Sequence, residues 1–120
     1  MTLHSTSVSL DEDGRVRINR ACPAVKHAQF SVGDTQVKLE TGLAHRRTLI
    51  IKPLRSGTDP DRPRRWIVIG PDGFDAVDGT PVWEEFELIL TVSPENEVYA
   101  LKGDDENDPV DARILEIGEG

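Results

Sequence analysis

The sequence predicts an all-β protein, either an antiparallel β-sandwich or a small jelly-roll-like barrel, preceded by an N-terminal hairpin or arm. From about residue 31 onward the apolar residues recur with a period near two, which is the period of a strand. No window of twelve or more residues carries the apolar stripe of a helix. Turn-forming residues separate the apolar segments at short intervals, which favours a sandwich or barrel over a parallel α/β sheet.

The N-terminal stretch "VSLDEDGRVRI" predicts a β-hairpin. Val8 and Leu10 alternate before a turn at residues 11–14, and Val16 and Ile18 alternate after it. The positions between them are Ser or Arg, so one face of the hairpin is expected to face water.

The pattern then fails from residue 19 to residue 30, and Pro23 disfavours the interior of a helix or strand. We therefore interpret this stretch as an irregular connector. The expected organisation is residues 1–30 as hairpin and connector, a possible docking arm, and residues 31–120 as the sandwich domain.

Four segments at the centre of the chain have the pattern of strands. "TQVKLET" alternates, and "FELILTV" places Phe86, Leu88, Leu90 and Val92 on one face. "RTLIIKPL" and "WIVIG" are apolar on both faces, which indicates strands covered on both sides.

Two further strands are expected towards the C-terminus, giving five or six in the main body. "EVYALK" alternates, with Val98 and Ala100 on one face. In "VDARILEI" the apolar pattern changes parity between Ile114 and Leu115, as a β-bulge would make it do.

The composition sets limits on the environment and the partners. The chain has 120 residues, of which 37% are hydrophobic, and this fits one domain. No apolar run approaches the roughly 20 residues that span a bilayer, and the N-terminus does not resemble a signal peptide, so we expect no membrane partner and no classical secretion. The single cysteine, Cys22, excludes an intrachain disulfide and a cysteine-based metal cluster.

The charge argues against nucleic acid as a general partner. The formal net charge is −8, whereas binding to phosphates requires a basic surface. Ten arginines against four lysines, together with many aspartates, are typical of a salt-adapted protein. A GC-rich genome gives a similar arginine bias, so a halophilic origin is a hypothesis that loss of structure at low salt would support.

The segment "GPDGFDAVDG" is expected to turn the chain between two core strands. The sequence after it has the period of a strand, so no helix N-terminus is available to bind a phosphate. Asp72, Asp75 and Asp78 lack the alternate spacing of a calcium loop, and we expect them to face solvent or a partner. We predict no metal ion and no cofactor.

No catalytic arrangement is evident, and we expect the protein not to be an enzyme. The three histidines, His4, His27 and His45, lie outside any motif of a nucleophilic or zinc-dependent enzyme.

Arginines are the candidate interface residues. The segment "RSGTDPDRPRR" between two central strands holds four arginines, two prolines and a glycine, so it should protrude. Its arginines beside Trp66 could bind phosphates or single-stranded bases, but in so acidic a chain we favour pairing with the carboxylates of a neighbouring subunit. The predicted interface residues are Arg46, Arg47, Arg62, Arg64, Arg65 and Trp83.

Four segments in order, "SVGDTQVKLETGLAHRRTLIIKPL", "WIVIGPDGFDAVDGTPVWEEFELIL", "EVYALKG" and "ARILEIG", resemble the layout of small virion proteins of tailed bacteriophages and archaeal tailed viruses. The resemblance covers about residues 31 to 118 and rests on the order and spacing of short motifs. It implies a β-sandwich module that forms a symmetric homo-oligomer in the virion, as a capsid decoration, turret or fibre base. Its partners would be the major capsid protein or other virion proteins.

The resemblance also implies structural positions. They are the strand end at Ile69 and Gly70, the step at Gly79 and Pro81 into a strand of about ten residues, Tyr99 and Ala100 in the penultimate strand, and Leu115 and Glu116 in the last. Residues 55–65 depart from the layout, which has a tighter turn there, and this makes the loop a candidate subunit contact.

Two other classes of function compete with the structural role. The first is a β module that binds carbohydrate or calcium at a tail or fibre, and the second is a small enzyme. Trp66, Trp83 and Phe86 are candidate anchors, and we expect at least two of them to lie in the core. An exposed Trp83 favours the ligand-binding module, whereas a buried one favours the assembly subunit.

Overall fold

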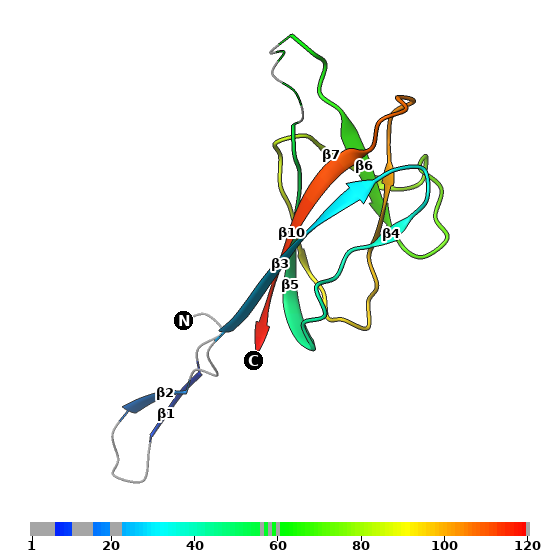
Figure 1. Ribbon diagram of the computed structural model, residues 1–120. Coiled ribbons are helices and arrows are strands. Elements are labelled where there is room, and N and C mark those ends of the chain that lie inside the picture. Colours follow the sequence, from blue (N-terminus) through cyan, green and yellow to red (C-terminus); the bar gives the residue numbers. More distant parts are fainter. Residues whose placement is uncertain are drawn as a thin grey trace.

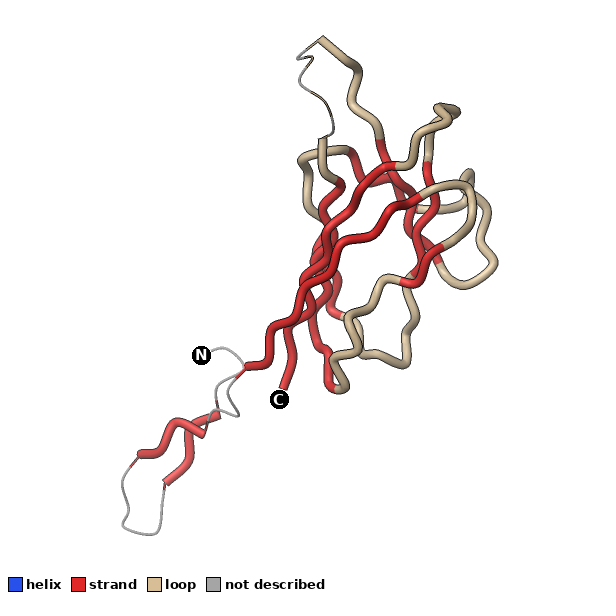
Figure 2. The backbone as a smooth tube through the Cα atoms, in the orientation of Figure 1, coloured by secondary structure: helices blue, strands red, loops and turns tan. Residues whose placement is uncertain are grey.

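Figure 1 shows a computed structural model of the chain, which describes residues 7–10, 16–19, 23–55, 57, 59 and 61–119. Within these residues the chain forms strands and no helix, as Figure 2 shows, so the all-β prediction is confirmed. None of them belongs to a helix able to cross a membrane. The strands are β1 (Ser7–Leu10), β2 (Val16–Asn19), β3 (Pro23–Val32), β4 (Val37–Lys38), β5 (His45–Pro53), β6 (Trp66–Gly70), β7 (Thr80–Trp83), β8 (Leu88–Thr91), β9 (Tyr99–Lys102) and β10 (Val110–Glu119).

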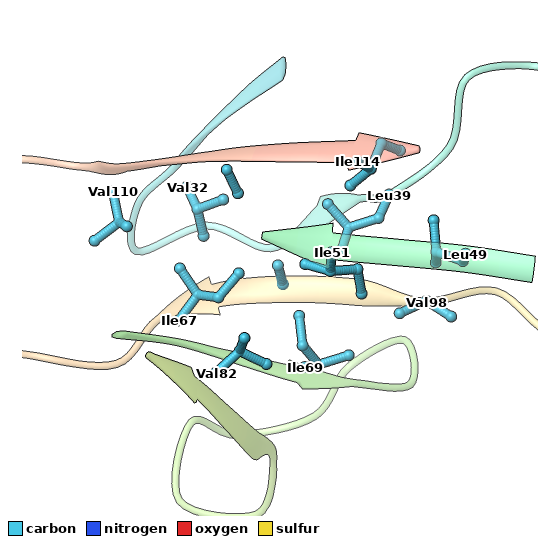
Figure 3. Close-up of a cluster of buried hydrophobic side chains, with 12 residues drawn as sticks. Val32, Leu39, Leu49, Ile51, Ile67, Ile69, Val82, Val98, Val110 and Ile114 are labelled. Atoms are coloured by element: carbon cyan, nitrogen blue, oxygen red, sulfur yellow. The ribbon is translucent and has the colours of Figure 1, made fainter. Parts of the chain in front are cut away.

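Two four-stranded sheets pack as a sandwich. The main sheet has the strand order β3-β10-β5-β8 and the second sheet has the order β4-β9-β6-β7, with antiparallel neighbours throughout. Alternate residues of each strand point into the space between the sheets. Figure 3 shows the resulting apolar core, whose members are Val32, Leu39, Leu49, Ile51, Ile67, Ile69, Val82, Val98, Ala100, Val110, Ala112 and Ile114.

The N-terminal hairpin is confirmed. Strands β1 and β2 form a separate antiparallel sheet in which Val8 pairs with Ile18 and Leu10 with Val16. The predicted turn at residues 11–14, and also His4 and Cys22, lie outside the described residues.

The expected irregular connector is wrong for residues 23–30, which begin strand β3. This strand pairs with β10 along its whole length, from Pro23 opposite Glu119 to Val32 opposite Val110. Proline is tolerated at the first position of an edge strand. The strand escaped detection because small and polar residues, from Ala24 to Gln29, hide its alternation. The boundary predicted at residue 30 therefore falls inside a strand.

The strand of about ten residues expected after Gly79 is two strands in different sheets. The chain leaves the second sheet after β7, turns at Glu84 and Glu85, and enters the main sheet as β8. Glu85 has a φ of 72°, a left-handed conformation that few residues other than glycine adopt. Phe86 follows this turn and is exposed, whereas Leu88, Leu90 and Val92 pack on the core.

The bulge lies at a different place from the one predicted. Strand β10 keeps its alternation through Ile114 and Leu115, and the register with β5 shifts between Ile117 and Gly118. Glu116, which the apolar pattern does not count, is buried on the core side. Because the prediction followed apolar residues alone, a buried acidic residue on the inner side of a strand looked like a change in which face is apolar.

The aspartate-rich loop turns the chain as expected. Strands β6 and β7 form an antiparallel hairpin around residues 71–79, and Asp72, Asp75 and Asp78 are exposed. The loop is closed by backbone hydrogen bonds from Phe74 to Pro71 and from Asp78 to Asp75.

Candidate interaction surfaces

The predicted interface residues differ widely in their burial. Arg46 and Arg65 are only 3% and 5% exposed, and each pairs with carboxylates of its own chain. Their predicted role in contacting another subunit is therefore corrected: their side chains are part of the fold. Arg62 is half buried, whereas the exposed members are Arg47, Arg64 and Trp83.

A β-bulge turns Arg46 into the core. The pairing of β5 with β10 skips Arg47, which changes the parity of β5 and points Arg46 inward beside Glu116. Gly118 lies opposite the bulge, where a Cβ atom would collide with the carbonyl oxygen of His45.

Arg46 binds three separate segments of the chain. Its Nη1 lies 2.7 Å from Glu116 Oε2 and also donates to the Leu39 carbonyl oxygen. Its Nε and Nη2 donate to three further carbonyl oxygens, those of Val92, Ser93 and Asn96. The other carboxylate oxygen of Glu116 accepts from the backbone N–H and the hydroxyl of Thr41. We call Arg46, Glu116 and Thr41 the core cage.

The core cage stabilises the ionised form of Glu116. Burial raises the pKa of this carboxyl, but the hydrogen bonds from Thr41 and the contact with Arg46 outweigh burial, so the pKa lies below its ordinary value.

Arg65 occupies a second cage at the opposite end of the sandwich. Its Nε and Nη2 lie 2.8 and 3.0 Å from the two carboxylate oxygens of Asp104, and it also donates to the Pro109 and Asp108 carbonyl oxygens. This bidentate pair lowers the pKa of Asp104 below its ordinary value, because the hydrogen bond from Arg65 outweighs the effect of burial. We call Arg65 and Asp104 the loop cage, since Asp104 belongs to the β9–β10 loop.

Glu84 binds the C-terminal end of the arginine-rich loop, which consists of residues 54–65 between β5 and β6. Both of its carboxylate oxygens lie within 3.1 Å of Arg62 Nη2, and Oε1 also accepts from the backbone N–H of Arg65. Across the loop, Arg55 Nη2 lies 2.7 Å from the Arg62 carbonyl oxygen. Arg62, which we expected to reach another subunit, therefore helps to hold its own loop.

Aromatic side chains form the first exposed surface. Trp83 and Phe86 are 42% and 54% exposed, so the expectation that at least two of the three anchors lie in the core is wrong. Trp83 rests against Trp66, with ring centroids 4.6 Å apart. Arg64 lies 5.1 Å from the centre of the Phe86 ring and also pairs with Glu85. We call Arg64, Trp83, Glu85 and Phe86 the aromatic patch.

The second exposed surface is the outer face of the main sheet, which points away from the core. The strand registers align two rows of outward residues across the sheet. The first row is His27, Leu115, Ile50 and Ile89, and the second is Val25, Ile117, Thr48 and Thr91. Val25 and Ile89 are exposed and the other apolar members are half buried. We call these eight residues the outer rows.

Polar side chains flank the outer rows on one side. Together with His27, Ile50 and Leu115 they line an open hollow of about 870 Å³; the polar members are Gln29, Lys52, Glu87 and Arg113. An apolar centre with a polar rim is the usual composition of a protein interface. The sequence indicated this surface only through "RTLIIKPL", which is apolar on both faces. Which residues align across the sheet could not be predicted without the strand order.

The described residues contain no group of three or more His, Cys, Asp or Glu side chains placed to hold a metal ion. His27 and His45, the two histidines within this part of the chain, are exposed on β3 and β5.

Comparison with known proteins gives no family. No family model matches the chain, and no curated protein matches it either. Among solved structures, a chain from the work described as "Bacillus endospore appendages form a novel family of disulfide-linked pili" is similar, with 15% sequence identity and a TM-score of 0.40 over 81% of this chain and 86% of that chain.

Proposed function

We propose that the protein is a non-enzymatic structural subunit of a tailed virus, which self-associates and docks on the particle as a capsid decoration, turret or fibre base. The observation that carries the self-association is the pair of outer rows. An antiparallel sheet of a monomer commonly presents one polar face to water. Here the middle strands place Leu115, Ile117 and Ile50 on that face, so a partner that covers it removes apolar area from water.

The charge of the chain predicts how this association depends on salt. Two copies with a formal net charge of −8 repel each other, and salt screens this repulsion over about 10 Å at 0.1 M. The apolar contact between outer rows does not depend on charged groups, so screening does not weaken it. We therefore expect the oligomer to be more stable at high salt, in keeping with the hypothesis of a halophilic origin.

Light scattering of the purified protein at high and low salt tests the self-association. We expect a closed oligomer at high salt, and we expect Ile50→Lys with Ile89→Lys to lower its mass because both changes place charges in the first outer row. Val77→Lys is the matched control, since Val77 is an exposed apolar residue in the β6–β7 loop. A wild-type monomer at every salt concentration would exclude a pre-formed oligomer.

The virion location needs a separate test. Purified virus particles carrying this gene product would be probed with an antibody against the chain, and we expect labelling on the particle surface. If the protein self-associates but is absent from particles, the proposed self-association is supported and the proposed place in the virion is wrong.

The exposed aromatic patch favours a second candidate, a β module that binds carbohydrate for host adhesion. Exposed tryptophan faces are platforms on which sugar rings stack, and Trp83 has this exposure. Titration with a glycan panel, with and without calcium, should then change tryptophan fluorescence in the wild type and not in Trp83→Ala. Absence of any change with the whole panel would remove this candidate.

A further inference from the structure

Strand β3 differs from the other sheet edges in length. The two sheets have four edges, formed by β3 and β8 in the main sheet and by β4 and β7 in the second sheet. Strands β4, β7 and β8 contain two, four and four residues, whereas β3 contains ten. One side of β3 pairs with β10, and the other side is the end of the sheet order. A long free edge is a template for pairing with another strand.

Strand β3 lacks three of the features with which proteins block such edges, although it keeps one, the charged side chain of Lys26. Edges are usually kept short, interrupted by proline or bulged. Strand β7 has Pro81 within it, whereas the proline of β3 is its first residue. The register between β3 and β10 runs through ten pairs without a shift, so the edge is not bulged.

The charge of β3 suits a partner that carries the same acidic surface. The chain has 22 Asp and Glu residues, but none of them lies in β3, whose charged side chain is Lys26. Two copies that approach along this edge bring no carboxylates of β3 into contact. The other edge strands, β4, β7 and β8, also lack Asp and Glu, so low repulsion permits pairing at β3 and its length favours it.

We propose that β3 pairs antiparallel with β3 of a second copy across a two-fold axis, which joins two main sheets into one sheet of eight strands. This inference rests on the proposed self-association and adds to the outer rows a second contact, at the edge of the main sheet. Pairing centred on Ala28 avoids the registers in which Lys26 or His27 faces itself. It aligns nine residues, 24 to 32, and places Val25 opposite Ser31 of the partner subunit.

The symmetry also unites the two outer faces. In this register each residue pairs with one of the same parity, so outward residues meet outward residues. The hollow reaches the β3 edge at His27 and Gln29, and it becomes continuous with the hollow of the second copy. The edge then supplies one contact between copies, while the joined outer faces stay available for the association through the outer rows.

Disulfide cross-linking tests the register directly, in full-length protein with Cys22→Ser. A disulfide requires Cβ atoms about 4 Å apart. Ala28→Cys should cross-link to itself. Val25→Cys and Ser31→Cys should not cross-link singly, because each lies six residues, or about 20 Å, from its symmetry copy. When these two variants are mixed, we expect at least a ten-fold increase in dimer.

Val77→Cys is the control, because it is exposed but lies in the β6–β7 loop. The proposed register is wrong if Val25→Cys and Ser31→Cys cross-link as strongly alone as they do in the mixture. It is also wrong if none of the three β3 positions cross-links. If light scattering still shows an oligomer in the latter case, the edge pairing is wrong and the proposed function stands. If the protein is a monomer by scattering and does not cross-link, both fall.

Discussion

The two Arg-Arg dipeptides of the chain offer a comparison between opposite ends of the sandwich. In each dipeptide one side chain is buried and its neighbour is exposed: Arg46 and Arg65 lie in cages, whereas Arg47 and Arg64 face solvent. The partners differ, however. The Glu116 side chain in the core cage is 2% exposed, and the Asp104 side chain in the loop cage is 11% exposed.

The two cages therefore differ in what could balance the arginine charge if its carboxylate partner were removed. Arg46 is surrounded by backbone carbonyl oxygens, so Glu116 supplies the carboxylate that balances its charge. Arg65 also has Glu106, a largely exposed carboxylate at 3.3 Å from its Nε. Water and Glu106 can therefore compensate in the loop cage, whereas the core cage is closed. The core cage should thus be the more sensitive of the two.

The largest effect is expected from Glu116→Gln. It leaves the Arg46 charge buried without a counter-charge, and removal of one member of a buried pair costs about 3–5 kcal/mol. Urea unfolding at neutral pH measures this loss. The double variant Arg46→Met with Glu116→Leu should recover most of it, because two apolar residues leave no buried charge. A loss below about 1 kcal/mol for Glu116→Gln would mean that water enters the cage.

Asp104→Asn should have a smaller effect. It removes a charged hydrogen-bond partner of Arg65, worth about 1.5–3 kcal/mol, while Glu106 remains beside the guanidinium. The same urea experiment applies, with Asp105→Asn as the matched control because Asp105 is the exposed neighbour in the same loop. If Asp104→Asn were as destabilising as Glu116→Gln, the proposed ranking of the cages would be wrong.

Acid should weaken both cages. The pKa values of Glu116 and Asp104 are lower in the folded protein than their ordinary values of 4.5 and 3.8. Their contribution to stability is therefore complete above about pH 4.5 and is lost as the pH falls through the folded pKa values. Thermal unfolding from pH 7 to pH 2.5 should show this loss, and the Glu116→Gln variant should lose less over the same window. An equal loss in the variant would show that Glu116 does not contribute.

The pattern of apolar residues was sufficient to predict most strands of this protein, but it failed at strand β3 and at the bulge. Strand β9 follows from its apolar alternation, and β5 and β6 follow from short runs that are apolar on both faces. Strand β3 was missed because its outward positions include His27 and Gln29 and its inward ones begin with Ala24. The bulge was misplaced because an inward Glu116 looks like an outward one until its partner is known.

The cages themselves could not be read from the sequence. Arg46 and Glu116 are 70 residues apart, and Arg65 and Asp104 are 39 apart, so strand order decides which carboxylate meets which arginine. The side chain of an arginine in a strand can point to either face of the sheet. The bulge at Arg47 makes that choice for Arg46, and it became visible only in the register between β5 and β10.

The smallest effect is expected from the exposed arginines. Arg64 and Glu85 are each about half exposed, and so are Arg47 and Glu119, so solvent and salt screen both pairs. Double-mutant cycles with alanine should give coupling energies of about 0.5 kcal/mol or less, which vanish at 1 M salt. A coupling above about 1 kcal/mol between Arg64 and Glu85 that persists at 1 M salt would instead mean that the aromatic patch is held rigid. A rigid patch suits ligand binding, because it has less conformational freedom to lose when a ligand binds.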